Sequence, residues 1–288
     1  MGTRPGCEAR HGPRGPRGPR GPRGLLAVLV TFALLLAACG ENTSDPDTEE
    51  GASETAADAT DEASLSGELV VFAAASLTDA FDELAQLLET EHPDLDVIAN
   101  LAGSQTLASQ LVEGAPADVF ASASNAQMDV VVAEGRVDEP VPFATNRLAI
   151  VVEPGNPLDI ETLADLARDE IVLVLAGEEV PAGQYAAQAL DEAGVEVTPS
   201  SLEVDVRAVL SKVVLGEADA AIVYASDVVA AGDTVEGVEI PDDDNVVASY
   251  PVARLTDAPN PDAAAAFVAL LRSPEGAAVL ERYGFGAP

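Results

Sequence analysis

Positive charge is nearly absent from this chain after its first 24 residues. Six of its 14 basic residues precede residue 25, and Lys212 is the single lysine. One of the 50 acidic residues also lies in that stretch, so the rest of the chain holds 8 basic and 49 acidic residues, a formal charge of −41. Such a surface repels nucleic acid and anionic lipid, which excludes the basic surfaces that usually bind them. We interpret the acidity as a source of solubility or salt tolerance, because it does not by itself identify a cationic ligand.

Cysteine, histidine and tryptophan are also scarce. The chain has no Trp, two Cys and two His, and beyond residue 38 Cys39 and His92 are the only Cys and His that remain. An internal disulfide is therefore excluded, and His92 lies in a predicted loop, Glu91-His92-Pro93, that forms no good catalytic triad. An extracellular enzyme that uses carboxylates stays open as an alternative, although no pair among the acidic residues is singled out.

Residues 1–38 have the pattern of an export signal. Arginines come first, followed by a 14-residue apolar run from Leu25 to Ala38, which is short for a span of the bilayer. The run ends in Leu-Ala-Ala-Cys, which resembles the lipobox of bacterial lipoproteins. The resemblance implies that Cys39 is lipidated, becomes the mature N-terminus and anchors the protein to the cell membrane outside the cytoplasm. A soluble secreted protein with an incidental Cys39 is the alternative.

The next segment, residues 39–66, is expected to be a disordered acidic tether. Nine of its residues are acidic and almost none is apolar, so it cannot bury enough surface to offset the chain entropy lost on folding. The folded part is therefore expected to begin near Gly67. The roughly 220 residues that follow fit either one large domain or two lobes of about 110 residues.

The folded part alternates between strand-like and helix-like patterns. Six short apolar or β-branched runs are predicted to be strands: 68–73, 94–101, 117–121, 147–152, 171–175 and 218–224. Helical stripes of apolar residues lie between them, the clearest over residues 77–88 and 206–214. This alternation predicts an α/β fold with mostly parallel sheets flanked by helices.

Four stretches are predicted to begin helices: 73–78, 103–107, 180–183 and 205–207. We expect Ser76 and Asp79 to form a capping box and Asp205 to be an N-cap. None of the four stretches has a dedicated cation. Helix N-termini carry unpaired N–H groups and partial positive charge, so several of them around one cleft would bind an oxyanion without Lys or Arg.

Five segments together resemble the molybdate-binding proteins of bacterial ABC importers. They are VFAAASLT at 71–78, GAPADVF at 114–120, VPAGQYA at 180–186, IVYASD at 222–227 and ERYGF at 281–285. The resemblance implies a two-lobed periplasmic-binding-protein fold with a two-strand hinge. It also implies that residues 67–145 plus 249–288 form lobe 1 and residues 146–248 form lobe 2. The hinge is expected near residues 144–147 and 249–252.

The resemblance also assigns the ligand contacts. Ser76 and Ser104 would give hydroxyl and N–H donors from lobe 1, Ala182 and Val206 would give backbone N–H donors from lobe 2, and Tyr224 would give its hydroxyl. Molybdenum would be held as molybdate through these five residues, with no direct bond between protein and metal. Gln105 departs from the family, in which a small residue is common at this position.

The implied function is an extracytoplasmic, lipid-anchored monomer that captures molybdate and tungstate and delivers them to an ABC permease with its cytoplasmic ATPase. It is not expected to be an enzyme or to use a cofactor, since molybdate is the cargo. Another oxyanion such as sulfate is the alternative ligand. Three consecutive acids, Asp242-Asp243-Asp244, lack the ligand spacing of a calcium loop and predict a solvated turn. We expect Arg207 to pair with an acidic residue.

Overall fold

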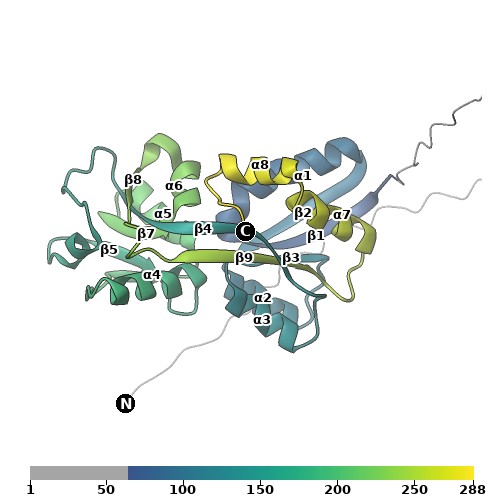
Figure 1. The fold of residues 1–288 in the computed structure, drawn as a ribbon, viewed down its shortest axis with the longest axis horizontal. Coiled ribbons are helices and arrows are strands. Elements are labelled where there is room, and N and C mark those ends of the chain that lie inside the picture. Colours follow the sequence, from purple (N-terminus) through teal and green to yellow (C-terminus); the bar gives the residue numbers. More distant parts are fainter. Residues whose placement is uncertain (1–63) are drawn as a thin grey trace, which may run out of the picture. The chain divides into compact units, whose positions relative to one another are not determined.

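The computed structural model describes residues 64–288, which Figure 1 shows as a ribbon. The predicted signal peptide, Cys39 and the predicted tether up to residue 63 lie outside the described residues. The strands of the described region are β1 (Ser66–Ala74), β2 (Asp94–Ala102), β3 (Val119–Ala121), β4 (Val141–Val152), β5 (Leu173–Ala176), β6 (Ser201–Glu203), β7 (Ala220–Tyr224), β8 (Glu236–Glu239) and β9 (Val247–Arg254). They pair in the order β2-β1-β3-β9-β4-β7-β5-β6, and β8 pairs with β4.

Strand β4 belongs to two halves of this sheet. Its residues 141–147 pair with β9, whereas residues 148–152 pair with β7 and β8. The first lobe contains β2, β1 and β3, and the second contains β7, β5, β6 and β8; β4 and β9 run side by side between them (Figure 1). The predicted two-lobed α/β fold is confirmed.

The sheet is mixed rather than mostly parallel. Strands that lead into helices pair in parallel, as β1 does with β2 and β3, and β5 does with β6 and β7. The pairs β3–β9, β4–β9, β4–β7 and β4–β8 are antiparallel. The difference arises because β4 and β9 pass from one lobe to the other and run against their neighbours in each.

Helices cover both faces of each half of the sheet. They are α1 (Thr78–Glu91), α2 (Ser104–Val112), α3 (Asn125–Ala133), α4 (Pro181–Glu192), α5 (Val206–Val214), α6 (Ala225–Ala231), α7 (Pro261–Leu271) and α8 (Pro274–Arg282). In the first lobe α1, α7 and α8 lie on one face and α2 and α3 on the other (Figure 1). Within residues 64–288 no single helix is both long enough and apolar enough to cross a membrane. The helices α7 and α8 meet both criteria only when they are taken together, and the angle between them is 64°.

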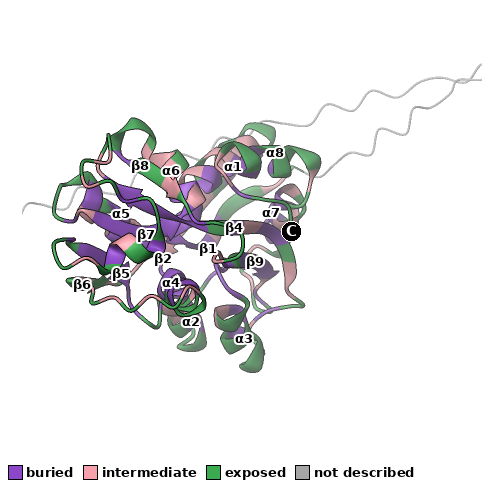
Figure 2. Cartoon of the chain, turned by 60° about the vertical axis from the view of Figure 1, so that its left-hand side comes forward, coloured by how far each residue is buried: buried purple, intermediate pink, exposed green. Residues whose placement is uncertain are grey.

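The core follows from the apolar patterning. In α1 the side chains of Ala80, Phe81, Leu84 and Leu88 are buried on one face, as the stripe over 77–88 predicts. Every residue of β7 is buried because helices cover this strand, and Figure 2 shows buried strands inside and exposed outer helix faces. Each large apolar side chain buried in this way stabilises the fold by about 1.5–3 kcal/mol.

Candidate functional site

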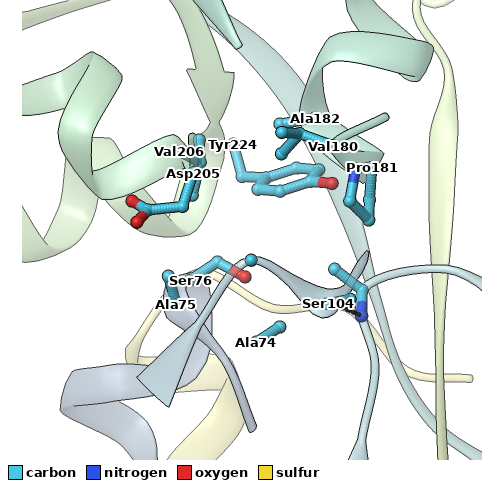
Figure 3. A pocket seen from close by; sticks show the side chains of 12 residues that line it. Ala74, Ala75, Ser76, Ser104, Val180, Pro181, Ala182, Asp205, Val206 and Tyr224 are labelled. Carbon is cyan, nitrogen blue, oxygen red and sulfur yellow. Dashed lines mark hydrogen bonds between the residues drawn. The ribbon is translucent and has the colours of Figure 1, made fainter. Parts of the chain in front are cut away.

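The four predicted helix starts lie around one pocket between the lobes. Helix α2 begins at Ser104, α4 at Pro181 and α5 at Val206, and α1 follows a short 3₁₀ turn at Ala75–Leu77. The pocket has a volume of about 210 Å³, counted with its opening to solvent. It is lined by Ala74, Ala75, Ser76, Gly103, Ser104, Ala123, Val180, Pro181, Ala182, Asp205, Val206 and Tyr224. All five predicted ligand residues are therefore among its walls, and Figure 3 shows them on two facing sides.

Ser76 is held from behind by a second hydroxyl. The predicted capping box of Ser76 and Asp79 is wrong, because Ser76 lies in the 3₁₀ turn and the N-cap of α1 is Leu77, which makes no side-chain cap. Ser76 Oγ instead lies 2.8 Å from Tyr250 Oη. Asn146 Nδ2 lies 3.5 Å from the same Tyr250 oxygen and 2.8 Å from Ser226 Oγ. A buried hydrogen-bonded chain thus ends at Ser76 on the pocket wall.

Ser104 is the first residue of α2 and keeps a hydroxyl proton free for a ligand. The N-cap before it, Gly103, has no side chain to cap the helix, so the first N–H groups of α2 are left for a ligand or water. Ser104 Oγ accepts the Ala123 N–H at 3.0 Å. Since the oxygen is occupied as an acceptor there, its own proton remains available for donation.

The second lobe contributes two helix N-termini. Helix α4 begins at Pro181, which has no N–H, so the N–H of Ala182 is the first one this helix can offer. Asp205 is the N-cap of α5, as predicted, and its carboxylate accepts the Ala208 N–H at 2.8 Å. Val206 is the first residue of α5, so its N–H has no acceptor inside the helix.

Gly183 allows α4 to start this close to the sheet. A Cβ atom at this position would lie 2.1 Å from the carbonyl oxygen of Gly177 and 2.6 Å from that of Ala176. Any side chain would push the start of α4 away from the end of β5. In the Pro-Ala-Gly motif, Gly183 is therefore needed for close packing of α4 against the end of β5, while Pro181 and Ala182 line the pocket.

Tyr224 ends β7 and has a buried hydroxyl with no hydrogen-bond partner among the described residues. An unpaired buried hydroxyl costs about 1–3 kcal/mol, so its position on a pocket wall points to a ligand that accepts a hydrogen bond. Burial raises the pKa of Tyr224 well above its usual value of 10.0. The phenol is therefore a neutral donor at physiological pH.

No Lys or Arg side chain lines the pocket among the described residues. The predicted pairing of Arg207 is confirmed, because its Nε lies 3.0 Å from Asp227 Oδ1 and its Nη2 lies 2.5 Å from Asp79 Oδ2. The donors at the pocket are thus neutral hydroxyl and amide groups together with helix N-termini. Such a set can bind an anion without the cost of desolvating a cation.

The predicted acidic turn lies away from the pocket. Asp242 and Asp243 are exposed in a turn, as expected, and Asp242 pairs with Arg147. Within residues 64–288 no group of three or more His, Cys, Asp or Glu side chains could hold a metal ion.

The sequence did not predict the two residues that support Ser76 from behind the pocket wall. Asn146 and Tyr250 lie on the two strands that pass between the lobes, where the sequence pattern indicates a hinge only. Asn146 directly precedes the predicted strand 147–152, so the sequence pattern carries no signal that this side chain is buried and needs hydrogen-bond partners.

Two α/β lobes joined by two long strands, with a pocket between helix N-termini of both lobes, define the class of the periplasmic binding proteins. The chain belongs to the family described as bacterial extracellular solute-binding proteins, which it matches over residues 69–286. The molybdate-binding protein ModA of Mycobacterium tuberculosis is 40% identical over 221 residues, which are 76% of this chain and 85% of that protein. ModA of Escherichia coli is 36% identical over 231 residues, which cover 76% of this chain and 89% of that protein.

A solved structure shares the fold. The periplasmic molybdate-binding protein of Azotobacter vinelandii superposes with a TM-score of 0.68 at 19% identity, covering 76% of this chain and 99% of that one. The relatives named here are all binding proteins.

Proposed function

We propose that this protein captures molybdate outside the cytoplasm and delivers it to an ABC importer. The observation that carries the proposal is the buried, unpartnered hydroxyl of Tyr224 on a pocket walled by helix N-termini. The pocket leaves only about 10 Å³ for the centres of water-sized groups, which favours a small ion over a drug-sized ligand. The two ModA relatives support molybdate as that ion.

In the proposed complex the five predicted residues hold the oxyanion. Ser76, Ser104 and Tyr224 donate through their hydroxyl groups, and Ala182 and Val206 donate through their backbone N–H groups. Hydrogen bonds to a charged group contribute about 1.5–3 kcal/mol each, so five of them can exceed the roughly 8 kcal/mol of micromolar affinity after the costs of association. Molybdenum is bound through its oxygens, without a ligand atom from the protein.

Ion size sets the expected selectivity. A ring of donors fixed by two helices on each lobe cannot contract fully around the smaller sulfate ion, so sulfate should bind more weakly. Tungstate has nearly the same size and charge as molybdate and should bind almost equally well. Sulfate remains the alternative ligand.

The delivery step rests on the architecture and on the predicted anchor. We propose that residues 67–145 plus 249–288 and residues 146–248 are the two lobes, and that they close on the ligand as a monomer by bending near residues 144–147 and 249–252. Lipidation of Cys39 would hold the protein at the membrane, and residues 39–66 would let it reach the permease.

Isothermal titration calorimetry tests the ligand. The chain that begins at Gly40 lacks Cys39 but keeps every described residue, and it should be titrated with molybdate, tungstate and sulfate. We expect molybdate and tungstate to bind well above sulfate. Equal affinity for sulfate would contradict the assignment to molybdate, and no heat with any of the three would contradict an oxyanion site.

A further inference from the structure

Two side chains of the first lobe hold one short segment of the second. Gln105, on α2, donates from Nε2 to the carbonyl oxygen of Val204 at 2.9 Å. Asp79, on α1, pairs with Arg207 at the start of α5. Both contacts cross between the lobes and end within residues 204–207, the segment that carries the Val206 N–H at the pocket.

Arg207 is held on its own lobe by Asp227 and at the same time contacts Asp79 on the other lobe. Its Nε lies 3.0 Å from Oδ1 of Asp227, whose side chain is fully buried. The other oxygen of Asp227 accepts the backbone N–H of Tyr224 at 3.1 Å. The guanidinium is therefore tied to the strand end that carries the pocket hydroxyl, and its second nitrogen is directed at the opposite lobe.

Gln105 reaches across from the other side of the segment. Its amide folds over Gly103, because a Cβ atom at Gly103 would lie 2.5 Å from Gln105 Oε1. Gly103 itself lines the pocket. The glutamine is thus at the pocket rim.

We propose that Asp79 and Gln105 act as an inter-lobe clamp on residues 204–207 that keeps the closed cleft shut and sets the rate at which the ligand leaves. The proposal rests on the function proposed above. Neither contact touches the ligand, and each joins two lobes that must separate for release. The clamp therefore stabilises the closed complex and leaves the encounter with the open cleft unchanged, so its loss should raise the dissociation rate and leave the association rate as it was.

Asp79→Asn separates the clamp from a simple charge effect. Asp79 is an acidic residue close to an anion site, so as a mere charge its removal would slow dissociation of a dianion. As a clamp residue its removal should speed dissociation, by about two- to fivefold for an ion pair whose side chains are 26% and 40% exposed. Asp82→Asn, on the exposed face of the same helix, removes the same charge without touching the second lobe.

Gln105→Ala tests the second contact in the same way, with Gln86→Ala on the exposed face of α1 as its matched control. Arg207 is left unchanged, because its removal would leave Asp227 buried without its cation. The readout is release of radiolabelled molybdate from the chain beginning at Gly40, chased with excess unlabelled molybdate. Both clamp variants should release it about two- to fivefold faster than the wild type, and both controls should match the wild type.

The salt dependence of the dissociation rate is a further test, because a residue that only supports folding would not change it. Salt screens a partly exposed ion pair, so dissociation from the wild type and from Gln105→Ala should speed up with salt, whereas Asp79→Asn should respond less. Unchanged or slower release in both variants would overturn the clamp while the ligand assignment stands. A wild type that fails to bind molybdate would instead overturn the proposed function.

Discussion

The hydroxyl groups of Ser76 and Tyr250 lie 2.8 Å apart, one on the wall of the pocket and the other behind it on the strand β9 that links the lobes. Asn146 can only donate from its Nδ2, which lies 3.5 Å from Tyr250 Oη. Either hydroxyl of the Ser76–Tyr250 pair can be the donor. In the arrangement in which Asn146 donates to Tyr250 and Tyr250 donates to Ser76, the proton of Ser76 is free to point at the ligand. The chain from Asn146 through Tyr250 thus allows Ser76 to act as a donor.

Tyr250→Phe should weaken molybdate binding by about 0.5–1.5 kcal/mol, the usual net value of one neutral hydrogen bond. The ring keeps its edge-on contacts with Phe143, Tyr224 and Phe285, so the core should stay packed. Calorimetry of the variant measures the loss, and Tyr283→Phe, at the end of α8 away from the pocket, serves as the control. Unchanged affinity would show that Ser76 needs no partner behind it.

Tyr224→Phe should have a larger effect on binding and should not weaken folding. It removes a proposed ligand donor, which should cost about 1–3 kcal/mol of molybdate affinity. The ligand-free variant should unfold at the same or a slightly higher denaturant concentration, because it no longer buries an unpaired hydroxyl. Wild-type affinity in this variant would remove Tyr224 from the site.

The regular elements of the fold could be predicted where burial produces a continuous pattern. The strands β1 and β7 and the helix α1 follow their apolar runs closely. Strands β6 and β8 were missed because they are short and no residue in them is buried, so their sequences carry no apolar period. The antiparallel pairing of β4 and β9 is a property of connectivity, which local patterns do not encode.

The pocket could be predicted from motifs, but its supporting contacts could not. Ser76 illustrates the limit, because its spacing to Asp79 is that of a capping box, while in the fold it bonds to a residue 174 positions away. Asp79 likewise pairs with Arg207, 128 positions away. A local sequence pattern identifies a polar group that needs a partner, whereas the partner is chosen by the tertiary structure.

Added salt should speed the association of molybdate with the wild-type protein. The chain beyond residue 24 carries a formal charge of −41, which repels a dianion that approaches the cleft. Raising the ionic strength from about 0.01 M to 0.15 M shortens the Debye length from about 30 Å to 8 Å and screens that repulsion. Stopped-flow mixing over this range measures the association rate. A rate that is constant or falls with salt would indicate that the potential at the cleft is not negative.

Asp227 should make the stability of the protein depend on pH. Burial raises the pKa of this carboxyl from 3.8 to about 6, against the opposing effects of Arg207 and of the Tyr224 N–H. Asp79 and Asp205 also face it and raise its pKa further. Between about pH 4 and pH 6 the folded chain holds a proton that the unfolded chain has released, so the free energy of unfolding falls as the pH rises through this window.

Denaturant unfolding of the wild type and of Asp227→Asn at several pH values between 4 and 7 isolates this contribution. The variant cannot titrate at this position, so the stability of the wild type relative to the variant should fall by a few kcal/mol, at most about 3, as the pH rises through the window. Asp233→Asn, an exposed position, should keep the pH dependence of the wild type. A wild type that instead gained stability relative to Asp227→Asn as the pH rose would mean that the ion pair with Arg207 outweighs the burial of Asp227, and that its pKa is lowered rather than raised.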